Sequence, residues 1–195
     1  MAHKKTGQHE FATVLYDTLF GLVLFFSLDS FLDVTDPAHF LFYLFATAVL
    51  VHWWLMFKAS EDIFGNEFRV TALHLVLNLS VILLLEFFIL NARSFNYLAA
   101  ALFMLAVFVV DMIWAGLALR VHPFKAKGRA LAAMRKELRY IVGTDAVVVA
   151  LFGALTATTF LFALPPLLFV VGFVGVYLFF IQLSFKFQII DLKVF

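Results

Sequence analysis

The sequence predicts an all-α integral membrane protein, a bundle of six transmembrane helices with both termini in the cytoplasm. Of its 195 residues, 65% are hydrophobic and only 14% are charged, whereas a soluble domain carries about 25% charged residues. The apolar residues fall into six runs, and the basic residues gather on one side of those runs. We therefore expect one transmembrane domain, residues 1–195, that crosses the cell membrane several times.

Each apolar run has close to the roughly 20 residues that cross about 30 Å of hydrocarbon. The first run follows a start without a signal-peptide cleavage pattern, so we expect it to be retained as a helix. The connections are short, and Pro165-Pro166 separates the last pair. The expected spans lie near Phe11–Leu32, Phe40–Phe57, Val70–Leu90, Tyr97–Leu119, Tyr140–Leu164 and Leu167–Phe185.

The distribution of basic residues sets the expected orientation. With both termini inside, Arg93 is the only one of the 14 Lys and Arg residues in an outer segment, which satisfies the positive-inside rule. The longest inner segment, "RVHPFKAKGRALAAMRKELRY", has apolar residues at helical spacing among its charges. It is either an amphipathic basic helix lying on anionic lipid or an ordinary inner loop whose end extends the fifth helix.

Composition and motifs exclude several classes of function. A net charge of +1 gives no support for a nucleic-acid partner, and the lack of cysteine excludes disulfides and cysteine-ligated metals. The sequence shows no nucleophile paired with a base, no phosphate-binding loop and no dense cluster of metal ligands. We therefore expect neither an enzyme nor a protein with a resident metal or cofactor.

Polar residues recur near the inner ends of several spans. At 1.5 Å per residue they lie at one depth, and in lipid each would remain unsatisfied without a partner. Asp145 in the fifth span lies at a similar depth, and Asp111 in the fourth lies slightly deeper. The expected inner network joins the first three spans through Tyr16, Asp17, His52, His74 and Asn78.

Three interpretations of these polar residues remain open. The network could hold the helices together and could also support a gate. The buried Asp and His residues could instead form a proton relay. His52 and His74 could also ligate one haem between two helices, because they lie at similar depth.

Asp29 lies on a different face of the first span. Twelve residues at 100° each place it about 120° around the helix from Asp17. Stepping back from Asp29 by threes and fours gives Phe26 or Phe25, then Leu22. A carboxylate at the outer end of an apolar stripe suits a cation-attracting mouth above a hydrophobic constriction. Alternatively, Asp29 simply lies in the outer membrane interface.

The first three spans resemble those of the lysosomal-type potassium channels and their bacterial relatives. That family carries an Arg…Phe-Ser-Asp signature, then an apolar helix and an acidic residue. Here Leu15-Tyr16-Asp17 stands at the Phe-Ser-Asp position, and the signature Arg is absent. The segments "FYLFATAVLVHWWLMFK" and "ALHLVLNLSVILLL" are similar to the second and third helices of the family.

The resemblance implies a potassium-type cation channel without a carbonyl selectivity filter. Bacterial members assemble as tetramers in which the first helix lines the pore and an apolar side chain forms the constriction. Counted from Asp17, the pore-lining residues would be Leu22, Phe26 and Asp29. The expected partners are K⁺ or another monovalent cation, the lipid bilayer and three further copies of the chain. The alternatives are an accessory subunit of a larger membrane complex, and a proton-coupled or haem-binding membrane protein.

Overall fold

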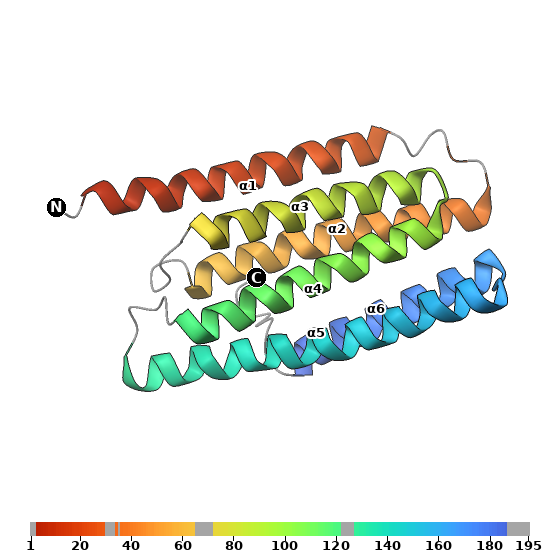
Figure 1. Cartoon of the computed structure of the whole chain (residues 1–195). Helices are drawn as coiled ribbons and strands as arrows, with labels where there is room; N and C mark the ends of the chain where they lie inside the picture. The colour runs from red at the N-terminus through yellow and green to blue at the C-terminus, as the bar shows by residue number, and fades with distance from the viewer. Residues whose placement is uncertain (1–2, 30–33, 35, 65–71, 122–126, 187–195) are drawn as a thin grey trace.

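The computed structural model describes residues 3–29, 34, 36–64, 72–121 and 127–186. This part of the chain is all-helical, with six α-helices and no strand. The helices run alongside one another, and α1 lies at one edge of the bundle while α5 and α6 lie at the other (Figure 1). In chain order they are α1 (His3–Asp29), α2 (Pro37–Phe64), α3 (Ala72–Arg93), α4 (Tyr97–Val121), α5 (Gly128–Phe162) and α6 (Pro166–Lys186).

Five of these helices are long and apolar enough to cross a membrane, so the chain has the character of a multi-pass membrane protein. The all-α fold class and the order of the helices agree with the prediction from the sequence. The five candidate spans are Pro37–Lys58, Ala72–Arg93, Tyr97–Arg120, Leu131–Phe162 and Pro166–Ser184.

Several helix bounds differ from those expected. The helix α1 begins at His3 rather than near Phe11, and α2 continues to Phe64. The largest difference is in α5, which begins at Gly128, twelve residues before Tyr140. The basic segment before the fifth span is therefore the first part of α5 itself.

The start of α5 is helical because its apolar side chains have a surface to pack on. Met134 and Leu138, one helical turn apart, are buried against Ala115 and Ala118 of α4. The small alanine side chains allow the two helices to approach closely. Of the two interpretations of the basic segment, the structure shows the extension of the fifth helix.

Aromatic rings make up much of the bundle core. The rings of Phe42, Phe88, Phe108 and Phe152 have no exposed surface and come from four different helices. They pack with each other or around Phe173 of α6 at centroid distances of 4.8–5.9 Å. Such edge-on and stacked pairs add stability beyond burial alone, and they hold α2, α3, α4 and α5 against α6.

Local capping explains where three of the helices begin. Asp36 accepts a hydrogen bond from the backbone N–H of His39 at the start of α2 (2.8 Å), and Asn96 does the same for Ala99 in α4 (3.3 Å). The helix α6 begins at Pro166, a first-turn position where the missing N–H costs nothing.

Candidate functional site

The helix α1 has one face packed on the bundle and one face exposed. Tyr16, Phe20, Val23 and Ser27 follow one another at steps of four, three and four residues, and all are at most 9% exposed. This spacing places them on one side of the helix, where α1 contacts α2 and α3. The position and rotation of α1 are therefore fixed by its contacts within the chain.

The predicted pore-lining residues lie on the exposed face of α1. Leu22 is 48% exposed, Phe26 is 64% exposed, and Asp29 is also exposed. Phe26 contacts the ring of its neighbour Phe25 at a centroid distance of 5.8 Å. The structure thus brings these three side chains onto the surface that the chain would present to lipid or to another copy.

Asp17 joins α1 to α2 through two polar contacts. The indole N–H of Trp54 donates a hydrogen bond to Asp17 Oδ1 (3.1 Å), and Lys58 Nζ forms an ion pair with Asp17 Oδ2 (2.5 Å). Neither Trp54 nor Lys58 was predicted from the sequence as a partner of Asp17. Their spacing of four residues, which places both on one face of a helix, was the available signal.

The remaining members of the predicted network divide among three helix contacts. Asn78 of α3 donates a hydrogen bond to the hydroxyl of Tyr16 (3.2 Å). His52 Nδ1 lies 2.8 Å from the hydroxyl of Tyr177 in α6, rather than against α1. His74 of α3 is buried, with its ring edge-on to Trp114 of α4 at 5.8 Å.

This arrangement separates the two histidines that could have shared a haem. His52 faces the α2–α6 contact, whereas His74 faces the α3–α4 contact. Among the described residues, no group of three or more His, Cys, Asp or Glu side chains could hold a metal ion.

Two carboxyl groups meet between α4 and α5. The side chains of Asp111 and Asp145 face each other across this contact, and Asp145 is only 1% exposed. Two carboxylates that face each other in an apolar interior repel, which favours the state in which the pair holds a proton. The sequence placed Asp145 near the inner end of the fifth span and Asp111 slightly deeper in the fourth, but helix depth alone does not reveal which side chains face each other.

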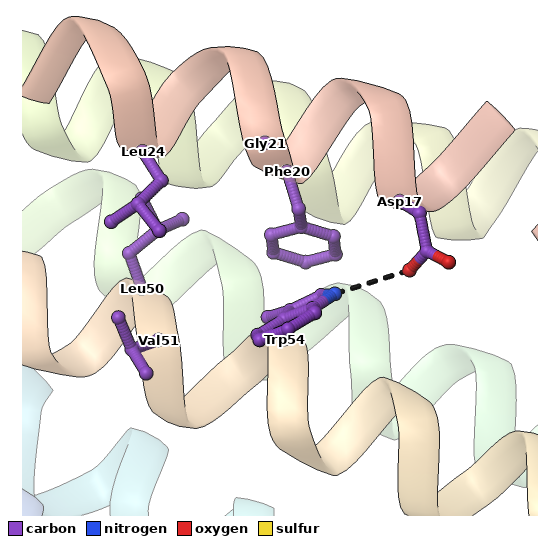
Figure 2. Close-up of a pocket in the computed structure, with 7 residues that line it drawn as sticks. All are labelled: Asp17, Phe20, Gly21, Leu24, Leu50, Val51 and Trp54. Atoms are coloured by element: carbon purple, nitrogen blue, oxygen red, sulfur yellow. Dashed lines mark hydrogen bonds between the residues drawn. The ribbon is translucent and has the colours of Figure 1, made fainter. Parts of the chain in front are cut away.

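A groove of about 110 Å³ runs between α1 and α2 (Figure 2). Asp17 and the indole of Trp54 lie at one end, and apolar side chains continue from there along both helices. The groove is lined by Asp17, Phe20, Gly21, Leu24, Leu50, Val51 and Trp54.

Comparisons of the chain with protein-family models, with curated proteins and with solved structures give no match.

Proposed function

We propose that the chain is a cation channel of the cell membrane, in which four copies surround a pore lined by α1. In this proposal all six helices cross the membrane and both termini are cytoplasmic. The permeating ion is K⁺ or another monovalent cation. The observation that carries the proposal is the exposed stripe of Leu22, Phe26 and Asp29 on a helix whose opposite face is anchored.

The anchored face supports this role because a pore-lining helix has to keep its rotation. Hydrogen bonds from Asn78 to Tyr16 and from Trp54 to Asp17 hold α1 near its middle. Near its outer end, the hydroxyl of Tyr43 donates a buried hydrogen bond to the carbonyl of Ser27 (2.7 Å). A helix that is hydrogen-bonded to its neighbours at its middle and near its outer end would present the same stripe in every copy.

The exposed stripe has the chemistry of a narrow cation path. Leu22 and Phe26 would form rings of apolar side chains, which oppose ion passage by excluding water from the constriction. Asp29, about one turn beyond Phe26, would attract cations to the mouth. A stripe on the outside of one bundle can line a pore only when several copies gather around it. The number four follows from the resemblance to the channel family.

Ion flux from liposomes that contain the purified protein tests the proposal. Leu22→Ala and Phe26→Ala widen an apolar constriction and favour its wetting, so each should raise K⁺ flux several-fold without loss of assembly. Phe160→Ala in α5 is the matched control, because Phe160 is even more exposed (76%) than Phe26 but lies on a different helix from the proposed pore lining. It should leave the flux unchanged.

The accessory-subunit alternative gives a different outcome. If the protein purifies with other chains, and neither the parent nor any variant conducts alone, the channel proposal is wrong. If Phe26 is a packing residue in a complex, its truncation should instead disrupt assembly, with a loss of about 3–5 kcal/mol.

A proton-coupled carrier is the second candidate function, favoured by the carboxyl groups of Asp111 and Asp145, which face each other between α4 and α5. A pair that holds a proton between two helices can release it when the helices move apart. Proton flux, measured with a pH-sensitive dye inside liposomes, should then be lost in Asp145→Asn and retained in Phe26→Ala. The channel proposal instead predicts that Phe26→Ala raises K⁺ flux.

A further inference from the structure

The groove between α1 and α2 extends from the edge of an apolar span toward the middle of it. Lys58, whose ammonium pairs with Asp17, is the last residue of the candidate span Pro37–Lys58, so this end lies near the lipid headgroups. Val51 and Leu50 line the groove seven and eight residues earlier, which is about 10–12 Å deeper at 1.5 Å per residue. The groove therefore covers headgroup depth and acyl-chain depth together.

The lining of the groove changes character along this direction. Its deeper part is made by aliphatic and aromatic side chains, among them Phe20, Leu24 and Leu50. The space beside Gly21 is open, because a Cβ atom added there would meet nothing within 4 Å. At the headgroup end stand the indole of Trp54 and the carboxylate of Asp17 (Figure 2). An apolar chain fits the first part, and a polar group fits the second.

The charges at the headgroup end remain accessible. The side chain of Lys58 is 34% exposed and that of Asp17 is 40% exposed, although the two form an ion pair. A carboxylate beside an ammonium complements a headgroup that carries a phosphate beside a primary ammonium. An anionic headgroup without an amine would place its negative charge close to Asp17, and it would therefore bind less favourably than a headgroup with an ammonium.

We infer that this groove binds one phospholipid with an ethanolamine-type headgroup, its acyl chain against Gly21 and Leu50, its ammonium on Asp17 and its phosphate on Lys58. The inference does not depend on α1 lining a pore. A protein that binds this lipid but does not conduct would contradict the channel proposal alone. A protein that conducts without headgroup preference would contradict the lipid site alone.

Contact quenching of tryptophan fluorescence tests the site directly. The full chain is placed in vesicles that contain phosphatidylethanolamine or phosphatidylglycerol with brominated acyl chains, which quench only indoles that they touch. The signal of Trp54 is the difference between the parent and Trp54→Phe. We expect quenching of Trp54 with a preference of roughly threefold for the ethanolamine headgroup, the effect of one exposed ion pair. Asp17→Asn should remove this preference.

Two glycine variants provide a matched comparison. Gly21→Leu should fill the groove and abolish quenching of Trp54 by either lipid. Gly175→Leu in α6 is the control, because Gly175 is also an exposed helical glycine with nothing within 4 Å of an added Cβ, and it should leave the quenching unchanged.

Two results would overturn the inference. One is equal quenching of Trp54 by both lipids in the parent. The other is an unquenched Trp54, which would mean that another copy of the chain covers the groove. Thermal unfolding of each variant in detergent identifies any substitution that fails to fold, and Asp17→Asn and Gly21→Leu test the site independently.

Discussion

His52 and Tyr177 form a polar contact in the otherwise apolar region between α2 and α6, with 2.8 Å between His52 Nδ1 and the hydroxyl. Removing the hydroxyl leaves a partly buried ring nitrogen without this partner. We therefore expect Tyr177→Phe to lower the free energy of unfolding by about 1–3 kcal/mol, measured by thermal unfolding in detergent. Tyr97→Phe is the control, because Tyr97 packs through its ring against Phe169. Equal effects of the two variants would show that the hydroxyl contact contributes nothing specific.

Asp29 lies at the exposed end of the α1 stripe, so its proposed role depends on charge rather than on packing. Asp29→Asn should lower K⁺ flux at about 0.01 M salt, where charges act over about 30 Å, and much less at 1 M, where the range is about 3 Å. Glu86→Gln in α3, another exposed carboxylate, should have little effect at either concentration. A reduction that is the same at all salt concentrations would indicate a structural role for Asp29.

The sequence predicted the depth of the polar residues but not the direction in which each one points. Asp17 and Tyr16 do join α1 to its neighbours. His52, however, has a partner 125 residues away in α6. Depth follows from a count of residues along each helix. The direction in which a side chain points depends on the rotation of its helix and on which helices lie beside it. Both depend on packing throughout the bundle.

The helix α5 shows how tertiary contacts determine the length of an element. Its basic first turns carry Arg129, Arg135, Lys136 and Arg139, a composition that also suits a helix lying on anionic lipid. The decisive contact is the burial of Leu138 against α4. The apolar spacing was visible in the sequence, but the surface that it covers was not.

Leu138→Ala tests this packing. Leu138 has no exposed surface, so its truncation should lower the free energy of unfolding by about 2–4 kcal/mol, measured by thermal unfolding in detergent. Leu151→Ala, at a position in the same helix that is 39% exposed, should cost less than about 1 kcal/mol. A small effect at both positions would mean that the first turns of α5 do not pack on α4 in solution.

At the scale of the whole molecule, the helical bundle was predictable because membrane thickness fixes the length of an apolar span. The connections from α3 to α4 and from α5 to α6 are short, and α3 packs on α4 as α5 does on α6. The contact of α2 with α6 was not predictable in this way. It depends on rings such as Phe42, Phe45 and Phe173 that fit together only in the folded bundle.

The orientation of the bundle in the membrane is predicted from the distribution of its basic residues. Ser94, shortly before α4, and Lys127, directly before α5, are exposed residues, and the chain has no cysteine of its own. With 13 of its 14 basic residues in the inner segments, the positive-inside rule places Ser94 outside and Lys127 inside.

In intact cells, a membrane-impermeant thiol reagent should therefore label Ser94→Cys, and it should label Lys127→Cys only after the membrane is opened. Labelling of both positions in intact cells would contradict the proposed orientation, and labelling of Lys127→Cys alone would reverse it. The reversed orientation would also place the Asp17–Lys58 end of the groove in the other leaflet, because this pair lies at the same end of the bundle as Lys127 in the proposed topology.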